Sequence, residues 1–568
     1  MTTGSRGTVR RAPAAFAAVL CLAAGTPPLG AEATGLTGPQ ISAASNMAQG
    51  RQEDLIDSAI ALGVTDFRDG VYWAEAEQVA GTYTFDTPMQ TFPDALAKEG
   101  ATVSLTHNWG NPLYDDGATP HTPEAIAAFG AFAGAVAERF PNMTRLEIGN
   151  EFNGVNFVSG PVREMTAQER ALAYTKLLEA SDRAARAANP DIKILGGATH
   201  SIPAGYLWTM FDAGAANWMD AIAIHPYTTH SDQFARQIEV LRRHPEARGL
   251  PIEVTEFGDS DPATAAGHLV RNYCQMALSG VQRVVWYPLN DRNDGLVPLI
   301  SPEGSITPAG RAFRLVAELM EGRPVTDASP DPFTYGCRFG SDVLVIWGAS
   351  REVSVPQGTE VLDAAGAALA PPYALSPDAP LVLRVAADAG PVALDAGQPG
   401  LVADSFAQFF YPQGDEARAA GDAFERFARR DGRIIPLRTL PGQERSGTPW
   451  FPYRGNPDAG VIRLTADSLV PGGTPDRPTE IVHRYVAPEA MTVRPVAEFS
   501  IAEHSEDGIT VTATLNGENL FTGLGSGILE FSLPDLKLEE GDILEISVGP
   551  NQNPKGDVVG FRIRLFEP

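Results

Sequence analysis

Short apolar runs and helical patterns alternate along the first half of the chain. Between residues 38 and 323, eight runs have the composition of β-strands, namely 41–45, 66–72, 102–107, 144–149, 192–197, 221–225, 252–256 and 283–287. Most are continuously apolar, which is typical of parallel strands that are covered on both faces. Amphipathic, alanine-rich stretches such as 124–140 and 167–188 lie between them. Eight strands that alternate with helices over about 280 residues predict an α/β fold, a closed (β/α)8 TIM barrel.

An open, doubly wound sheet is the competing architecture. It requires a glycine-rich phosphate-binding loop after an early strand. No such loop follows the early apolar runs of this sequence. The pattern therefore favours the closed barrel.

The pattern changes after residue 323, where helical periodicity gives way to short alternating runs between Gly, Pro, Asp and Ser turns. Residues 324–392 predict a small antiparallel β-domain. Residues 395–568 predict a jelly-roll-like β-sandwich, with one helix-like piece at 415–430. This domain resembles jelly-roll modules that are appended to polysaccharide enzymes, and the resemblance makes it a candidate carbohydrate-binding domain. Within it, the aromatic cluster at 450–453 is either a sugar-stacking surface or, as we favour, a plug of the sandwich core.

The first 33 residues have the pattern of a signal peptide. Arg6, Arg10 and Arg11 precede an apolar stretch at 12–24, and small residues at Ala31 and Ala33 suit signal peptidase. The stretch is too short to span a bilayer. We expect cleavage near Ala31–Ala33 and a secreted or periplasmic protein; a structureless tail is the alternative.

Charge narrows the range of partners. The chain has 568 residues and a formal net charge of −27. Such a surface repels nucleic acid and anionic lipid. We expect no nucleic-acid partner, no stable membrane insertion, and a monomer.

Three cysteines are present, and one of them, Cys21, lies in the signal segment. Cys274 and Cys337 have the option of pairing in an oxidising compartment. The sequence alone favours two buried, unpaired thiols. No cluster of cysteines and histidines has the spacing of a zinc site, so we expect no metal.

Two glutamates have the best placement for catalysis. Barrel enzymes carry catalytic residues at the carboxyl ends of their strands. Glu151 follows the fourth run and Glu256 closes the seventh. Cleavage of a glycosidic bond requires two such carboxyl groups on either side of the anomeric carbon. Each glutamate alone is better explained as a strand-end salt bridge, but the pair with its neighbours favours catalysis.

Those neighbours resemble the clan A glycoside hydrolases, the four-seven superfamily of barrels, and most closely families 39 and 5. The resemblance covers about residues 38–322. It implies Glu151 as acid/base after strand four and Glu256 as nucleophile at the end of strand seven. Eight positions agree with the clan pattern in strand order: Arg68, His107, Asn150, Glu151, His225, Tyr227, Glu256 and Trp286.

The resemblance implies a role for each neighbour. Asn150 donates to the sugar 2-hydroxyl. Arg68 and Tyr227 hydrogen-bond Glu256 and keep it ionised. The charge of Glu256, together with burial, raises the pKa of Glu151.

All of the ring residues except Trp286 have two possible interpretations. His107 and His225 orient substrate hydroxyls or carboxylates, or else are packing histidines. Trp286 offers a stacking face at the cleavage subsite. Trp73 and Trp109 are further platforms or core residues, whereas Asp69 is expected to pair with Arg68.

The sequence therefore predicts a retaining β-glycoside hydrolase that acts on a polysaccharide or oligosaccharide without a cofactor. Two alternatives stay open. One is exopolysaccharide trimming or transglycosylation by the same residues. The other is a non-catalytic carbohydrate-binding protein.

Overall fold

A computed structural model describes residues 35–50, 53–474 and 476–568. Leu36–Pro568 form one compact unit. The signal segment expected at residues 1–33 lies outside the described residues. Among the residues described, no helix is both long enough and apolar enough to cross a bilayer.

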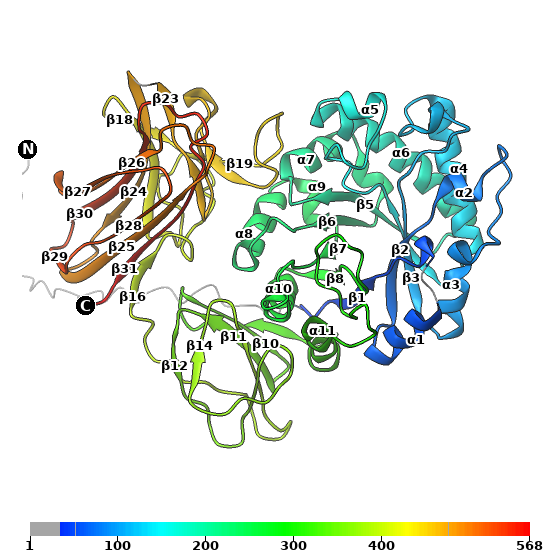
Figure 1. The fold of residues 1–568 in the computed structure, drawn as a ribbon, viewed down its shortest axis with the longest axis horizontal. Helices are drawn as coiled ribbons and strands as arrows, with labels where there is room; N and C mark the ends of the chain where they lie inside the picture. The colour runs from blue at the N-terminus through cyan, green and yellow to red at the C-terminus, as the bar shows by residue number, and fades with distance from the viewer. Residues whose placement is uncertain (1–34, 51–52, 475) are drawn as a thin grey trace, which may run out of the picture. The chain divides into compact units, whose positions relative to one another are not determined.

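The first half of the unit is a closed barrel of eight parallel strands in sequence order (Figure 1). The strands are β1 (Gln40–Ala44), β2 (Asp66–Gly70), β3 (Thr102–His107), β4 (Met143–Ile148), β5 (Lys193–His200), β6 (Ala221–His225), β7 (Ile252–Phe257) and β8 (Val281–Trp286). All eight expected strands are present. The largest change is in β5, which continues three residues beyond its expected end and so brings His200 to the barrel rim.

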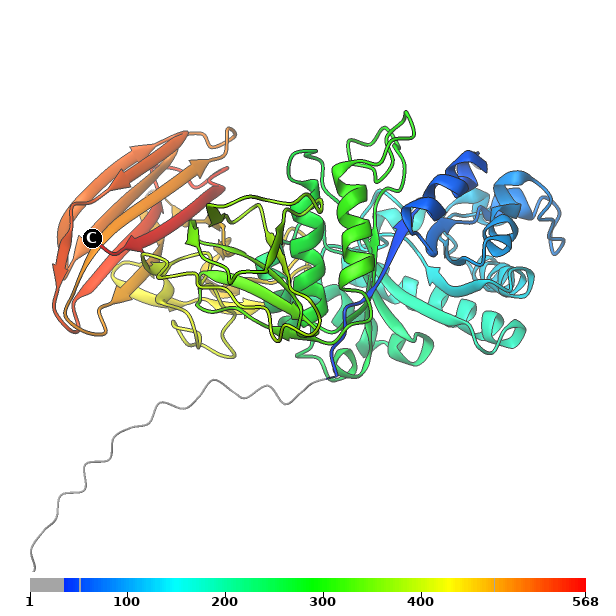
Figure 2. The ribbon, with the colours of Figure 1, turned by 90° about the horizontal axis from the view of Figure 1, so that it is seen from below.

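Eight longer helices cover the barrel: α1 (Glu53–Leu62), α3 (Pro88–Lys98), α4 (Pro123–Arg139), α6 (Ala167–Ala188), α7 (Ala204–Asp212), α8 (Ser231–Leu241), α10 (Ala265–Leu278) and α11 (Pro308–Leu319). Three short ones are α2 (Trp73–Ala76), α5 (Pro161–Glu164) and α9 (Pro245–Gly249), and η1 (Met47–Gln49), η2 (Asp115–Gly117) and η3 (Ala215–Trp218) are 3₁₀ turns. Helix α6 begins at a capping box between Thr166 and Glu169, which satisfies backbone groups at its first turn. Figure 2 shows α10 and α11 side by side.

Helices α4 and α6 pack closely against each other. A Cβ on Gly130 would lie 2.6 Å from the carbonyl oxygen of Ala180, and one on Gly134 would lie 3.1 Å from that of Ala184. Both glycines therefore permit the helix backbones to approach closely. Both helices also contact β4, the strand that precedes Glu151.

A small β-domain follows, as expected. One sheet has the order β13-β15-β11-β10-β9, and a separate pair is β12-β14. The strands are β9 (Val325–Asp327), β10 (Thr334–Phe339), β11 (Val343–Gly348), β12 (Arg351–Val353), β13 (Glu360–Leu362), β14 (Tyr373–Leu375) and β15 (Leu381–Arg384).

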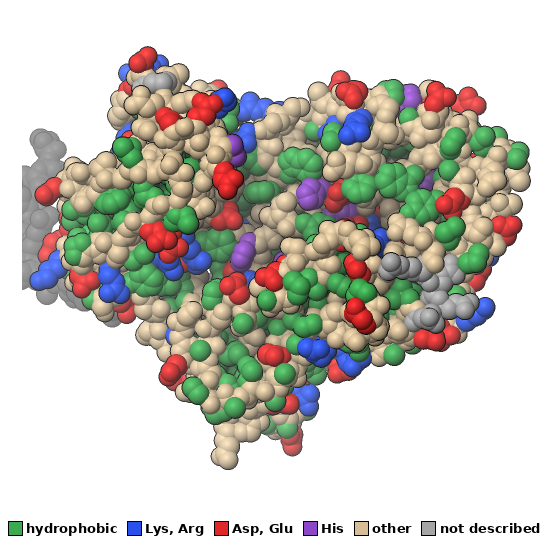
Figure 3. Space-filling model, viewed as in Figure 1, with side chains coloured by type: hydrophobic (Ala, Val, Ile, Leu, Met, Phe, Trp, Pro, Cys, Tyr) green, Lys and Arg blue, Asp and Glu red, His purple; other side chains and the backbone are tan. Residues whose placement is uncertain are grey.

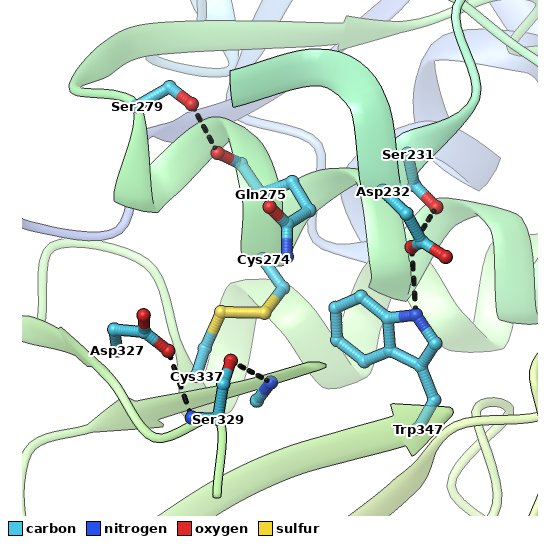
Figure 4. The surroundings of a disulfide bond; sticks show 10 residues. Ser231, Asp232, Cys274, Gln275, Ser279, Asp327, Ser329, Cys337 and Trp347 are labelled. Carbon is cyan, nitrogen blue, oxygen red and sulfur yellow. Dashed lines mark hydrogen bonds between the residues drawn. A yellow bond between two sulfur atoms is a disulfide. The ribbon is translucent and has the colours of Figure 1, made fainter. Parts of the chain in front are cut away.

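A disulfide joins this domain to the barrel (Figure 4). Cys274 of α10 and Cys337 of β10 are bonded, with Cα atoms 5.8 Å apart. The expectation of two unpaired thiols is wrong. Both side chains are fully buried, and the sheet packs on α10 so that the two thiols face each other. Trp347 of β11 donates to Asp232 of α8 at 2.9 Å beside the disulfide.

The last region consists of antiparallel sheets, consistent with the expected β-sandwich. One sheet follows the order β19-β20-β21-β22-β31-β25-β28, with β16 and β29 paired at its side. The other follows β18-β17-β24-β30-β26-β27, with β23 paired to β24. Alternate residues of β31 (Val559–Phe566) are buried, as a strand with one face on a core requires.

The other strands of this region are β16 (Leu401–Asp404), β17 (Phe424–Arg430), β18 (Arg433–Pro436), β19 (Arg438–Leu440), β20 (Tyr453–Gly455), β21 (Arg463–Leu464), β22 (Ser468–Val470), β23 (Gly472–Thr474), β24 (Arg477–Val486), β25 (Met491–Ile501), β26 (Ile509–Leu515), β27 (Glu518–Gly525), β28 (Ile528–Ser532), β29 (Leu536–Leu538) and β30 (Ile543–Pro550), with a 3₁₀ turn η4 (Pro457–Ala459). The helix-like piece expected at 415–430 is wrong, since β17 occupies its second half. Pairing of β17 with β24 overrides the helical preference of its Glu, Arg and Ala residues.

Candidate active site

Glu151 and Glu256 lie together at the carboxyl ends of the barrel strands. Glu256 is the fifth residue of β7, and Glu151 follows β4 after a turn in which Gly149 has a φ of 80°. Glu151 itself has a φ of 45°, and its amide donates to the carbonyl of Ala198 at 2.6 Å. This turn directs its side chain across the barrel mouth. Histidine and acidic side chains lie next to one another on this part of the surface, near β5 and β6 (Figure 3).

The two carboxylates are close enough to act on one bond. One oxygen from each glutamate and a ring nitrogen of His225 all lie within 4.8 Å of one another. The side chains of Glu151 and Glu256 keep 16% and 12% exposure, so solvent and small molecules reach both.

Glu256 is held by two donors. Arg68 Nη1 donates to one carboxylate oxygen at 2.6 Å, and the Tyr227 hydroxyl donates to the other at 2.9 Å. Burial and the charge of Glu256 raise the pKa of Tyr227 well above its usual value, so it stays a donor. The two hydrogen bonds expected from the sequence are present, one to each carboxylate oxygen, and together they fix the orientation of Glu256.

A third glutamate, Glu147 of β4, holds Arg68 and Thr255 in place. Arg68 Nε donates to Glu147 at 2.6 Å, and Thr255 donates to its other oxygen at 2.7 Å. Burial raises the pKa of Glu147, but the charge of Arg68 and bonds from His225 outweigh it, so Glu147 is ionised. The sequence analysis missed this residue, although a glutamate between Leu146 and Ile148 in the apolar end of a predicted strand is a signal that could have found it.

Two histidines contact Glu151. His225 Nδ1 lies 3.2 Å from Glu151 Oε1, and His200 Nδ1 lies 3.5 Å from the same oxygen. Burial raises the pKa of Glu151, but hydrogen bonds from His200 and His225 lower it to about 2. The expected rise in the pKa of Glu151 is therefore wrong for the unliganded protein. The sequence analysis considered only the charge of Glu256, whereas two imidazoles also lie beside this carboxylate.

His225 is a charged group at neutral pH. Burial lowers its pKa, but the charge of Glu256 and hydrogen bonds to Glu147 and Glu151 raise it to about 9. Both ring nitrogens then donate, Nδ1 to Glu151 and Nε2 to Thr255 at 3.0 Å. A protonated imidazole offers no lone pair to a metal, so the group Glu151, His225 and Glu256 fits a cation poorly.

Asn150 lies at the edge of this network. Its side-chain oxygen accepts from Arg68 Nη2 at 3.3 Å, and its backbone amide donates to Asn108 at 2.9 Å. The side-chain oxygen is thereby fixed, which leaves the amide nitrogen as the group available to a substrate hydroxyl.

Three of the expected ring residues do not reach the site. His107 is fully buried, its Nε2 donates to the Phe129 carbonyl at 3.1 Å, and burial lowers its pKa to about 3. Trp286 is fully buried and donates to the Val297 carbonyl at 3.0 Å, and Trp73 is fully buried against Tyr114. None presents a face to substrate in this structure.

Two further expectations have different outcomes. Trp109 is 43% exposed and lies beside Phe157, so it remains a candidate platform. Asp69 does not pair with Arg68; it accepts from the Ser45 hydroxyl at 2.6 Å and from the amide of Met47 at 2.7 Å.

A residue of the sandwich also borders the site. The loop at 441–450, between β19 and β20, places the ring of Trp450 at 5.1 Å from that of His200, in an edge contact. A Cβ on Gly154 would lie 3.2 Å from Trp450. The structure does not use Trp450 as the core plug that we favoured, since 36% of it is exposed.

Comparison with known proteins concerns the barrel as a whole. Residues 94–313 match the family model described as "Glycosyl hydrolase catalytic core". The barrel is a glycoside hydrolase catalytic core. Among curated proteins, none matches the sequence significantly.

Several solved structures of glycoside hydrolases are similar to this chain, and one of them has a TM-score above 0.5. One is a family 39 glycoside hydrolase from the gut symbiont Bacteroides cellulosilyticus WH2, with 20% identity, a TM-score of 0.51, and coverage of 61% of this chain and 81% of that chain. A family 39 β-xylosidase from Caulobacter crescentus has 17% identity, a TM-score of 0.43 and coverage of 62% and 98%. A family 30 endoxylanase from Clostridium papyrosolvens C71 has 13% identity, a TM-score of 0.45 and coverage of 62% and 98%.

Proposed function

We propose that this glycoside hydrolase cleaves β-glycosidic bonds of an oligosaccharide or polysaccharide with retention of configuration. The observation that carries the proposal is the spacing of Glu151 and Glu256, whose nearest oxygens lie within 4.8 Å. Retaining enzymes hold their carboxyl groups about 5–5.5 Å apart, whereas inverting enzymes keep about 6.5–9.5 Å for a water molecule.

In the first step, Glu256 attacks the anomeric carbon while Glu151 gives a proton to the leaving oxygen. Arg68 and Tyr227 each donate to one carboxylate oxygen of Glu256 and so fix its orientation toward the carbon. The products of this step are a glycosyl–Glu256 ester and the departing alcohol.

The proton for that step is shared between Glu151 and His225. In the free protein it sits on the imidazole, 3.2 Å from Glu151 Oε1. A proton held in a short contact with the acid is available when negative charge develops on the leaving oxygen. In the second step, Glu151 as carboxylate takes a proton from water, which attacks the ester and releases the sugar.

Substitution of each glutamate tests these roles. We expect Glu256→Ala to abolish turnover of a panel of 4-nitrophenyl β-glycosides, because no nucleophile remains. Glu151→Ala should lose activity as well, but azide should restore part of it on the substrate that the panel identifies, since a small anion attacks the glycosyl ester without base help. Normal activity of Glu256→Ala would overturn the mechanism.

Stereochemistry provides an independent measurement. Proton NMR of the first product formed from the active aryl glycoside should show the β-anomer before mutarotation. The α-anomer as the first product would indicate inversion and would contradict the role of Glu256 as nucleophile.

Export of the protein is part of the proposal. It is supported by the signal pattern in residues 1–33 and by the bond between Cys274 and Cys337, since disulfides persist in oxidising compartments. Mass spectrometry of the protein from the culture medium or periplasm should give a mature chain that starts between Ala31 and Thr34. An intact chain retained in the cytoplasm would contradict it.

A further inference from the structure

The loop at 441–450 of the sandwich is fastened to the barrel beside the catalytic pair. Figure 1 shows it, in yellow between β19 and β20, next to α7. The Gly205 amide at the start of α7 donates to the Gly442 carbonyl at 2.9 Å. Gln168 of α6 donates to the Gln443 carbonyl at 2.9 Å.

Gln443 and Asn153 form the centre of this attachment. Asn153 Nδ2 donates to Gln443 Oε1 at 2.9 Å, and Gln443 Nε2 donates to the main-chain carbonyl of Asn153 at 3.2 Å. Gln443 is only 5% exposed and has a φ of 50°, and its amide closes the loop by donating to Pro449 at 2.7 Å. A buried, reciprocally bonded amide pair holds the loop in one conformation.

Asn153 also fixes His200. The His200 amide donates to Asn153 Oδ1 at 3.0 Å, and Asn153 Nδ2 donates to the His200 carbonyl at 3.1 Å. One asparagine, two residues after Glu151, thereby ties the end of β5 and the sandwich loop to the catalytic turn. The loop places Trp450 against His200, which in turn contacts Glu151.

This position is on the side of Glu151, which the proposed function assigns to the leaving group. Glu151 protonates the oxygen that joins the cleaved sugar to its leaving group, so the leaving group lies beside Glu151. Trp450 contacts the residues next to Glu151, namely Gly154 and His200. The ring is exposed, although core tryptophans of the same barrel, Trp73 and Trp286, are fully buried.

We propose that Trp450 is the stacking platform for the sugar on the leaving-group side, so that the C-terminal sandwich supplies a substrate subsite of the barrel. This inference rests on the proposed function for the identity of that side. An indole face is apolar and flat, and it binds the C–H face of a pyranose ring while the hydroxyls stay in water. The substrate it selects is a glycoside whose leaving group is itself a sugar.

Kinetics with two kinds of leaving group test the proposal. For the sugar found active in the aryl glycoside panel, the wild type and Trp450→Ala are compared on the glycosyl fluoride and on the β-linked disaccharide. Fluoride has no ring to stack. We expect Trp450→Ala to lower kcat/KM for the disaccharide by roughly tenfold or more, and to leave the fluoride within about twofold.

Matched variants separate binding from folding. Trp450→Phe keeps an aromatic face and should recover most of the disaccharide activity. Trp218→Ala removes a partly buried tryptophan from η3, which precedes the amino end of β6, and should leave both substrates unchanged. Equal losses on fluoride and disaccharide with Trp450→Ala would overturn the proposal, and so would no loss on either.

A binding measurement keeps this test apart from the proposed reaction. The Glu256→Ala protein and the Glu256→Ala/Trp450→Ala protein are compared on an array of β-linked oligosaccharides. Weaker binding by the double variant supports the subsite even if the wild type hydrolyses nothing, which would contradict only the proposed reaction. Equal binding of the two proteins overturns the subsite.

Discussion

At the scale of single residues, the site is a chain of charges of alternating sign. Glu147 holds Arg68, Arg68 holds Glu256, and the cation of His225 lies between the three glutamates. Each charged group is buried or half-buried and has lost solvation free energy, so each depends on its charged partners to offset that loss. The geometry of the catalytic pair is therefore a property of the whole chain of charges.

Removal of Glu147 tests that dependence. In Glu147→Gln an amide N–H or a neutral oxygen faces Arg68, and the arginine loses one of its two carboxylates. We expect the free energy of unfolding to fall by about 3–5 kcal/mol, together with a loss of kcat, because Arg68 no longer points Glu256. Denaturant unfolding and aryl glycoside kinetics measure both effects.

Glu179→Gln is the control for Glu147→Gln. Glu179 pairs with Arg183 on the exposed surface of α6. Its substitution should change stability by less than about 0.5 kcal/mol and activity not at all. An equally small effect of Glu147→Gln would contradict the anchoring role.

The charge of His225 makes stability depend on pH. The pKa of His225 is about 9 in the folded protein, because carboxylates surround it, and about 6.5 in an unfolded chain. A raised folded pKa stabilises the protein fully below about pH 6.5, and that contribution is lost as the pH rises through about 9.

The Tm of His225→Asn compared with that of the wild type measures this contribution. We expect the deficit of the variant to be largest below pH 6.5 and to shrink steadily up to pH 9. The same scan with His121→Asn, a partly buried histidine of a barrel loop, controls for general effects of pH. A deficit that does not change with pH would show that His225 is not charged in the fold.

Prediction from sequence succeeded for residues whose position follows from a strand end. Glu151, Glu256, Arg68 and Tyr227 all lie at the barrel mouth, since the carboxyl ends of parallel strands converge there. His107 and Trp286 end their strands as well, but their rings turn into the layer between strands and helices, where Phe129 and Phe257 pack on them. The order of residues along a strand does not give that rotation.

At the scale of elements, the barrel depends on close helix contacts that the hydrophobic pattern does not reveal. The pattern gave α6 with its full length and α4 within one residue at each end. It did not show that Gly130 and Gly134 permit the two helices to touch. The same kind of pattern gave a helix where β17 lies, because strand pairing is not local in sequence.

Gly130→Ala tests the close contact. Alanine favours a helix over glycine by about 1 kcal/mol, but here its Cβ meets the Ala180 carbonyl at 2.6 Å. We expect a net loss of stability of about 1–3 kcal/mol, measured as a lower Tm. Gly249→Ala, whose Cβ would meet no heavy atom within 4 Å, should not lower the Tm, and equal effects of the two would contradict the account.

At the scale of the whole molecule, the barrel, the small β-domain and the C-terminal sandwich are joined by contacts between residues far apart in sequence. Domain order and type followed from composition and periodicity. The disulfide and the attachment of the loop at 441–450 to the barrel could not be predicted in this way. Neither the spacing of the cysteines nor the sequence of the loop indicates which surface each one contacts. Such contacts are determined by how the domains pack, and a single sequence contains no local signal of it.

The disulfide provides a test at this scale. A crosslink that closes a loop of 63 residues should stabilise the fold by about 4 kcal/mol. We expect Cys274→Ala/Cys337→Ala to lower the Tm, and a reductant to lower the Tm of the wild type to that of the double variant. A reductant that lowers the Tm of the double variant equally would mean that the crosslink is not responsible.

The reciprocal amide pair of Asn153 and Gln443 spans 290 residues of sequence. A ribosome releases the barrel strands first and Gln443 much later. A nascent chain therefore contains both catalytic glutamates before it contains the loop that holds Trp450 against His200. The order of synthesis therefore separates the formation of the pair Glu151 and Glu256 from the attachment of the loop that borders it.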